Sequence, residues 1–133
     1  MTESPTTGTQ TVKAFTEQTV LITGASRGIG AAIARRFASV GMNVVIHYLQ
    51  SHEAANETAR SCMKYGANVL TVTADLRSSE QIERMRDKLA QHGLIPDILV
   101  NNAGISHYGM LSDVTETDWD EIMSINVTGT FLM

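Results

Sequence analysis

The sequence predicts an α/β protein in which a parallel β-sheet carries helices on both faces. Two observations indicate this class. Short apolar runs alternate along the chain with longer segments of helical periodicity, and the apolar runs show no polar alternation. Strands that alternate with helices form βαβ units, whose strands are parallel. Strands without polar alternation are expected where both faces of the sheet are covered.

Strands are predicted from apolar runs that are rich in β-branched residues and too short for helices. The four runs are residues 19–23, 43–47, 68–74 and 97–100. Gly24 ends the first run, and Pro96 precedes the last.

Helices are predicted at residues 28–40 and 53–65, from Ser78 to the residue before Gly93, and from Thr115 onward. The first three are followed by glycine, at the position of a helix C-cap. Gln81 lies three residues after Ser78 and predicts a capping box, and Asp118 supports an N-cap at Thr115. The first helix has a predicted apolar face made of Ile29, Ile33, Phe37 and Val40.

The two ends of the chain differ in character. Residues 1–18 are polar and lack the apolar segment of a secretory signal, so we interpret them as a flexible N-terminal tail. Residues 19–133 are predicted to be a single domain. The last helix reaches Met133 without a glycine or proline after it. We therefore expect a domain truncated at its C-terminus, as the N-terminal part of a longer protein.

The composition narrows the function classes. Hydrophobic residues make up 43% of the chain and charged residues 18%, which is typical of a globular domain. The net charge of −4 argues against a nucleic-acid partner, and no apolar run is long enough to span a membrane. Cys62 is the only cysteine, which favours a reducing, cytoplasmic location. The four histidines lack metal-ligand spacing, so no metal site is predicted.

The motif that carries chemistry follows the first strand directly, where residues 23–30 read TGASRGIG. Gly24 permits a sharp turn, Gly28 lets a phosphate approach the backbone, and Gly30 lets the helix pack close to the strand. The helix N-terminus adds unpaired N–H groups and the positive end of the helix dipole. The alternative is a turn that merely uses convenient glycines, but the strand–turn–helix context favours a dinucleotide site.

With this G-x-x-x-G-x-G spacing the sequence resembles the short-chain dehydrogenase/reductase family, in its ordinary rather than its extended branch. Residues 101–104 (NNAG) match the second motif of the family. Asp75 and Leu76 match its adenine-contacting position, and Asn126 matches its catalytic asparagine. The resemblance covers residues 19–133 and is strongest to bacterial 3-oxoacyl-(acyl-carrier-protein) reductases.

The resemblance implies a Rossmann-type, doubly wound parallel sheet, of which four strands are present in the order 3-2-1-4. It implies that Asn126 takes part in a proton relay, by helping to hold a water next to a catalytic lysine. It also implies nucleotide contacts from the glycine turn and from the segments after strands two, three and four. The residues concerned are Thr23, Gly24, Ser26, Arg27, Gly28, Ile29, Gly30, Tyr48, Asp75, Leu76, Asn102, Ala103 and Gly104.

Some of these residues have a second interpretation. Asp75 is also suited to be a helix N-cap rather than an acceptor for the adenine amino group. Asn101 and Asn102 are also suited to stabilise a turn through side-chain to backbone hydrogen bonds. The resemblance favours the nucleotide site for all three.

The end of the second strand predicts NADP(H) rather than NAD(H). An acidic residue there would bind the ribose 2′-hydroxyl and repel a 2′-phosphate, but residues 46–51 (IHYLQS) contain none. Arg27 is placed to bind a 2′-phosphate with its guanidinium. The alternative for Arg27 is a solvated surface arginine.

Two function classes remain open. The first is an oxidoreductase that transfers a hydride between NADP(H) and a small carbonyl or alcohol substrate, with acyl thioesters among the candidates, and that forms a homo-oligomer at full length. The chain contains no Y-x-x-x-K, the pair that the family uses for proton transfer, so the chain alone is expected to be inactive. The second is a non-catalytic nucleotide-binding or scaffold polypeptide.

Overall fold

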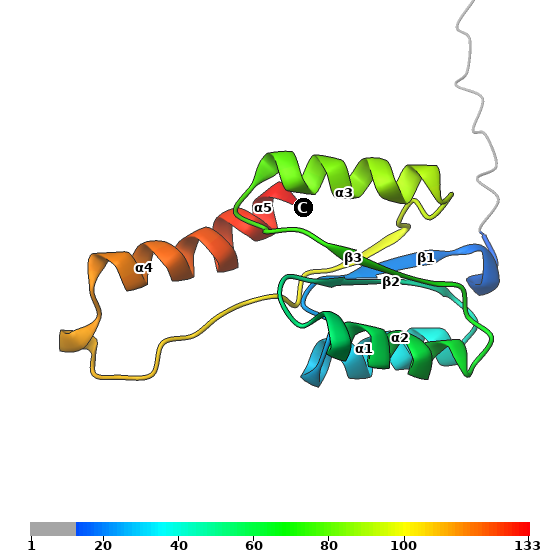
Figure 1. Ribbon diagram of the computed structural model, residues 1–133, viewed down its shortest axis with the longest axis horizontal. Helices are drawn as coiled ribbons and strands as arrows, with labels where there is room; N and C mark the ends of the chain where they lie inside the picture. The colour runs from blue at the N-terminus through cyan, green and yellow to red at the C-terminus, as the bar shows by residue number, and fades with distance from the viewer. Residues whose placement is uncertain (1–12) are drawn as a thin grey trace, which may run out of the picture.

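The computed structural model describes residues 13–133, which form one four-stranded parallel sheet with helices on both faces (Figure 1). The strands are β1 (Thr19–Ile22), β2 (Asn43–Tyr48), β3 (Val69–Thr73) and β4 (Ile98–Val100), and their order is β3-β2-β1-β4. All three strand pairs are parallel. The predicted fold class and strand order are therefore confirmed.

The helices form two layers. α1 (Gly28–Ser39) and α2 (His52–Met63) cover one face of the sheet, and α3 (Ser79–Gln91) lies on the other (Figure 1). The chain after β4 runs away from the sheet through the short 3-10 helix η2 (Leu111–Asp113). It then returns toward α3 as one rod of three joined segments. These are α4 (Glu116–Met123), the π-helical stretch η3 (Ser124–Gly129) and α5 (Thr130–Leu132).

The predicted N-terminal tail falls partly outside the structure, since residues 1–12 lie outside the described residues. Within residues 13–18 the chain forms the short 3-10 helix η1 (Phe15–Glu17). The Lys13 ammonium lies 2.7 Å from a carboxylate oxygen of Asp97, just before β4. The other oxygen of Asp97 accepts the Thr19 N–H at 2.9 Å, so the start of β1 is fixed to the start of β4.

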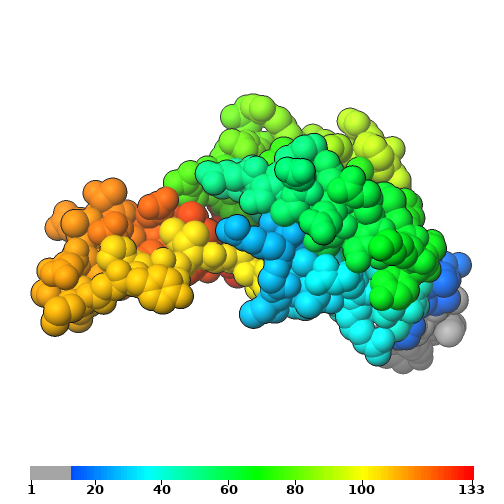
Figure 2. Space-filling view, turned by 60° about the horizontal axis from the view of Figure 1, so that its bottom comes forward, coloured from blue at the N-terminus to red at the C-terminus, as the bar shows by residue number. Residues whose placement is uncertain are grey.

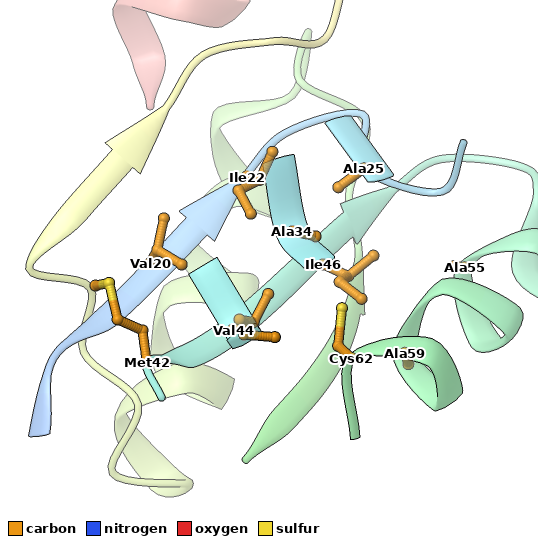
Figure 3. Close-up of a cluster of buried hydrophobic side chains, with 11 residues drawn as sticks. Val20, Ile22, Ala25, Ala34, Met42, Val44, Ile46, Ala55, Ala59 and Cys62 are labelled. Atoms are coloured by element: carbon orange, nitrogen blue, oxygen red, sulfur yellow. The ribbon is translucent and has the colours of Figure 1, made fainter. Parts of the chain in front are cut away.

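The predicted apolar face of α1 differs from the one that the structure buries. Ile29 is 74% exposed and Val40 is exposed as well, whereas Ile33 and Phe37 pack against the core. The fully buried positions of α1 are its small residues, Gly30, Ala31, Ala34 and Ala38. Small side chains let the helix axis approach the sheet, as Figure 3 shows for Ala34 between the side chains of β1 and β2.

The two predicted caps also have different outcomes. The box at the start of α4 is complete, because the Thr115 hydroxyl accepts the Asp118 N–H and the Asp118 carboxylate accepts the Thr115 N–H. At α3 the Ser78 hydroxyl accepts the Gln81 N–H at 3.3 Å, but the Gln81 side chain accepts the N–H of Asp75 instead of Ser78. The predicted box at α3 is thus half formed, and Gln81 secures the end of β3.

None of the helices described in residues 13–133 has the length and apolar character needed to cross a bilayer.

Candidate nucleotide-binding site

A cavity of about 460 Å³ opens at the carboxyl ends of the strands, where ligands bind in doubly wound sheets. It is bordered by the glycine turn after β1 and by the segments that follow β2, β3 and β4, and α4 closes one side. Nine of the predicted nucleotide contacts line it, and these are Gly24, Ser26, Arg27, Tyr48, Asp75, Leu76, Asn102, Ala103 and Gly104. Segments that lie far apart in the sequence are therefore brought together at one edge of the sheet.

Five predicted site residues do not line this cavity: Thr23, Gly28, Ile29, Gly30 and Asn126. Thr23 is 1% exposed, and its hydroxyl oxygen accepts the backbone N–H groups of Asn102 at 3.0 Å and Ala103 at 2.9 Å. The Thr23 side chain thus faces the segment after β4 and positions that segment. The Ile29 side chain points to solvent, which leaves only its backbone beside the turn.

The Asn102 side chain joins the second motif to the first. Its amide group donates to the carbonyl oxygens of Thr23 at 2.9 Å and Gly24 at 3.1 Å. Asn101 is exposed instead. Asn102 thus stabilises a turn through side-chain to backbone hydrogen bonds, as its second interpretation has it, and the turn is the glycine turn; its contact with a nucleotide stays a prediction.

The three glycines of the turn have different structural reasons. Gly24 and Gly28 have φ angles of +62° and +58°, which L-residues with a side chain rarely adopt. A Cβ on Gly30 would lie 2.6 Å from the Gly24 carbonyl oxygen, so only glycine lets α1 start this close to β1. A Cβ on Gly28 would meet no atom within 4 Å, so the space over Gly28 is open.

The segment after β2 presents a polar, uncharged surface to the cavity. Tyr48, Gln50 and Ser51 line it together with Leu49. The Tyr48 hydroxyl lies 2.5 Å from Nδ1 of His52, which orients the phenol ring. Arg27 also lines the cavity, and no carboxylate of residues 13–133 lies within ion-pair distance of its guanidinium.

Arg77 is a cavity residue that the sequence analysis missed. Its guanidinium lies against both carboxylate oxygens of Asp75, with a shortest distance of 2.7 Å, and the Arg77 N–H also donates to Asp75. These hydrogen bonds lower the pKa of the Asp75 carboxyl below its usual value, and the bonds from the Arg77 side chain contribute most. The Asp75 side chain does not cap α3, since Ser78 does so. The only feature of the sequence that could have indicated Arg77 as a cavity residue was its position directly after Asp75 and Leu76.

His47 is a second missed residue. It is 2% exposed and lines the cavity, and its two ring nitrogens contact the backbone of Gly24 and Ala74. Burial lowers the pKa of its imidazole, although the hydrogen bond to Ala74 acts in the opposite direction. The feature of the sequence that could have indicated His47 was its position at the end of an apolar strand that neighbours the strand before the glycine turn. Thr58 of α2 is a third residue that the sequence analysis missed, since its hydroxyl donates to the Ser26 carbonyl at 2.9 Å.

Asn126 lies in η3 and is half-buried. Its side-chain oxygen accepts the Ile105 N–H and its amide donates to the Ile105 carbonyl, both at 2.9 Å. A Cβ on Gly104 would lie 3.2 Å from this side-chain oxygen. Asn126 thus ties the segment after β4 to the rod, and its role in a proton relay stays a prediction.

Among residues 13–133 no group of three or more histidine, cysteine or acidic side chains has the geometry of a metal site. Cys62 is buried in the core between the sheet and α2, and burial raises the pKa of its thiol. The groups that line the cavity include backbone N–H groups, amides, hydroxyls, the imidazole of His47 and the charged side chains of Arg27, Asp75, Arg77 and Glu121.

Comparison with known proteins identifies what this arrangement is similar to. A family model described as short chain dehydrogenase matches residues 18–133. The chain is 37% identical over 121 residues to glucose 1-dehydrogenase 2 of Bacillus subtilis, covering 90% of this chain and 47% of that protein. It is 36% identical over 119 residues to a 3-oxoacyl-[acyl-carrier-protein] reductase of Synechocystis, covering 90% and 48%.

A solved structure shows the same likeness in three dimensions. A short chain dehydrogenase from Burkholderia cenocepacia, in complex with NADP, superposes with a TM-score of 0.83 at 36% identity. The match covers 90% of this chain and 49% of that one. The chain spans about half the length of each of these relatives.

Proposed function

We propose that this chain, which belongs to the short-chain dehydrogenase family, is the nucleotide-binding half of an oxidoreductase that transfers a hydride between NADP(H) and a small carbonyl or alcohol substrate. One observation carries the proposal. The glycine turn, the Asp75 segment and the Asn102 segment border a single cavity at the carboxyl ends of the strands. The nicotinamide cofactor would supply the hydride, and the residues of this chain bind and orient it.

The residues present fit a dinucleotide. The open space over Gly28 leaves room for a diphosphate against backbone N–H groups at the start of α1, where the helix dipole favours negative charge. Asp75 and Leu76 line the cavity, and a carboxylate and a backbone N–H are the acceptor and the donor that an adenine edge needs. Thr23 and Asn102 support this arrangement from behind, because their hydrogen bonds join the turn to the segment after β4.

NADP(H) is the proposed nucleotide rather than NAD(H). The segment after β2 places Tyr48, Gln50 and Ser51 on the cavity and no carboxylate, so a 2′-phosphate would meet no like charge there. Arg27 lines the same cavity, is free of carboxylate partners in residues 13–133 and can bind a phosphate bidentately.

Substrate, assembly and location are further parts of the proposal. The Synechocystis relative is named for an acyl-carrier-protein substrate, which supports an acyl thioester as one candidate. Exposed apolar side chains on α4 and η3, including Trp119, Met123 and Val127, suit a homo-oligomer interface. A single cysteine fits the cytoplasm.

A matched pair of glycine substitutions tests the site. Gly28 and Gly93 both have positive φ, at +58° and +66°, and both have open space where a Cβ would be. Replacement of either glycine by alanine should therefore lower the stability of the fold by a similar amount, about 1–2 kcal/mol, through backbone strain. Gly28→Ala should also weaken NADPH binding, measured by calorimetry, by about tenfold or more because its methyl group fills the phosphate space. Equal affinities of the two variants would refute the site.

The cofactor preference has its own test. The chain should bind NADPH more tightly than NADH, and Arg27→Ala should reduce that preference by about tenfold, since hydrogen bonds to charged groups contribute about 1.5–3 kcal/mol. Arg36→Ala, on the exposed side of α1, is the control and should leave the preference unchanged. Tighter binding of NADH by the unaltered chain would overturn the assignment.

Activity separates the oxidoreductase from the non-catalytic alternative. The chain holds no Y-x-x-x-K, so nothing in it is arranged to deliver a proton, a contribution of about 10²–10⁴ in rate. The purified chain should therefore show no NADPH oxidation above background with a panel of ketones and acyl thioesters. A reading frame that continues past codon 133 into a Y-x-x-x-K would support the oxidoreductase, and a stop codon there would favour the scaffold.

A further inference from the structure

A buried histidine joins the glycine turn to the end of β3. Nδ1 of His47 lies 3.2 Å from the backbone nitrogen of Gly24, and Nε2 lies 2.9 Å from the carbonyl oxygen of Ala74. A backbone N–H can only donate and a carbonyl can only accept. Both hydrogen bonds together therefore require a neutral imidazole that carries its hydrogen on Nε2 and accepts the Gly24 N–H at Nδ1.

We propose that His47 is a positioning residue of the nucleotide site, whose neutral imidazole keeps the phosphate-binding turn and the adenine-binding segment in register, so that nucleotide affinity falls when His47 is protonated. Gly24 begins the phosphate-binding turn, and Ala74 directly precedes Asp75. One side chain thus connects the two parts of the cavity that would bind opposite ends of an ADP moiety. The inference rests on the proposed function and adds a pH dependence to it.

Protonation conflicts with the observed geometry. An imidazolium carries a hydrogen on Nδ1, which would face the Gly24 N–H, so two donors would meet at a distance of 3.2 Å. Gly24 has little room to retreat, because a Cβ placed on it would lie 2.9 Å from the Cα of Ala103. The imidazole ring or the turn must therefore move, and either movement disturbs the register of Gly24 and Ala74.

Burial, rather than a neighbouring charge, sets the direction in which the pKa of His47 is shifted. Burial lowers the pKa of His47 from its ordinary value of 6.5, so the imidazole is neutral at neutral pH and its protonation needs acid. The titratable and charged groups that share its cavity are Arg27 of the turn, Tyr48 of its own strand, Asp75 and Arg77 after β3, and Glu121 of α4. Asp75 is engaged by Arg77. A bound diphosphate would attract an imidazolium and so oppose the effect, but only at long range, whereas protonation removes the hydrogen bond from Gly24 directly. Both ring nitrogens are already bonded to backbone, so neither is left to contact a phosphate.

The experiment measures the affinity of the full chain for NADH by calorimetry from about pH 7.5 down to about pH 5.0, because burial lowers the pKa of His47 below the ordinary value of 6.5. NADH is the probe because the 2′-phosphate of NADPH itself ionises near pH 6. The affinity of the unaltered chain should fall steadily on acidification, toward the about tenfold loss that is equivalent to one hydrogen bond. His47→Gln keeps a donor and an acceptor but does not titrate, so its affinity should be independent of pH. His47→Leu should bind weakly throughout, and His92→Gln, at the end of α3, should keep the unaltered profile.

Nitrogen NMR of the imidazole gives a second measurement that needs no variant. His47 should show the hydrogen on Nε2 at neutral pH, and its titration midpoint should coincide with the midpoint of the affinity loss. A hydrogen on Nδ1, or an NADH affinity of the unaltered chain that stays constant or rises on acidification, would overturn the inference. Absence of NADH binding at every pH would instead overturn the proposed function, and the inference with it.

Discussion

The molecule divides into two regions that are packed very differently. The body contains the sheet with α1, α2 and α3, and every residue of β1 is buried. The arm, defined here as residues 105–128, contains the segment after β4, α4 and most of η3, and none of its residues is buried. Figure 2 shows the arm projecting from the body as a separate lobe, with a hollow between the two.

The difference shows how each half of the candidate site is fixed. In the body, the glycine turn is surrounded by backbone atoms and by the side chains of Thr23, His47 and Asn102. Arg77 of the body lies 3.9 Å from Glu121 of the arm, and inside the arm the hydrogen bonds of Asn126 hold Ile105, the first residue after the body. The phosphate side of the cavity is therefore built into the core, and the side lined by α4 depends on contacts that are easily lost.

The largest expected effect comes from placing the same methyl group in each region. A Cβ on Gly30 would lie 2.6 Å from the Gly24 oxygen and 2.9 Å from the Cα of Ala25, both fixed backbone. Gly30→Ala should therefore lower the free energy of unfolding by about 3 kcal/mol, as strong overpacking does. Gly129 is the buried residue directly after the arm, and a Cβ on it would lie 3.0 Å from the Cβ of Leu76 and 3.2 Å from the Leu76 carbonyl oxygen, a milder crowding than at Gly30. Gly129→Ala should change stability by less than about 1 kcal/mol, since the gain in helix propensity offsets the crowding.

Urea unfolding of both variants measures this difference. Both glycines lie in helical backbone, so both gain the same propensity from alanine, and each serves as the control for the other. Equal losses of stability in the two variants would show that the arm is packed as rigidly as the body.

A smaller contrast is expected from two asparagines that each make two hydrogen bonds to backbone. Asn102→Ala leaves the Thr23 and Gly24 carbonyls without these donors and should lower the free energy of unfolding by about 2 kcal/mol. Asn126→Ala should leave global stability within about 1 kcal/mol, because the arm can open without unfolding the body. Its effect should appear as faster hydrogen exchange of the Ile105 amide, which donates to Asn126.

Mass-spectrometric hydrogen exchange and urea unfolding distinguish the two outcomes. Asn101→Ala is the matched control for Asn102, because Asn101 is exposed, and it should change stability by no more than about 0.5 kcal/mol. If Asn126→Ala reduced global stability as much as Asn102→Ala, the arm would have to unfold together with the body.

The same division explains what the sequence predicted and what it did not. The strands and the glycine turn were predictable because apolar runs and glycines at positive φ are local constraints, whereas the strand order was predicted from the family resemblance. The sequence did not indicate that Thr23 faces Asn102, or that His47 and Arg77 line the cavity, because side-chain direction depends on how distant segments meet. On α1 the buried face consists of small residues rather than Ile29, since close approach to the sheet outweighed hydrophobicity. In the arm, the helix predicted from Thr115 onward is present, but its apolar residues Trp119 and Val127 are exposed.

The smallest expected effect concerns Arg77, which lies between body and arm. Its hydrogen bonds lower the pKa of the Asp75 carboxyl from 3.8, so the ionised form of Asp75 is favoured in the folded state. The sign follows from linkage: this stabilisation is present above pH 3.8 and is lost as the pH falls through the lowered pKa. Because the pair is accessible to solvent, Arg77→Gln should reduce stability at neutral pH by well under about 1 kcal/mol.

The pKa of Asp75 is a sharper measurement than stability. Carboxyl NMR should place it below 3.8 in the unaltered chain and closer to 3.8 in Arg77→Gln. Arg84→Gln, which removes an ion pair with Glu80 on the exposed surface of α3, should leave the Asp75 titration unchanged. If Arg77→Gln also left it unchanged, Arg77 would not be the group that orders this end of the cavity.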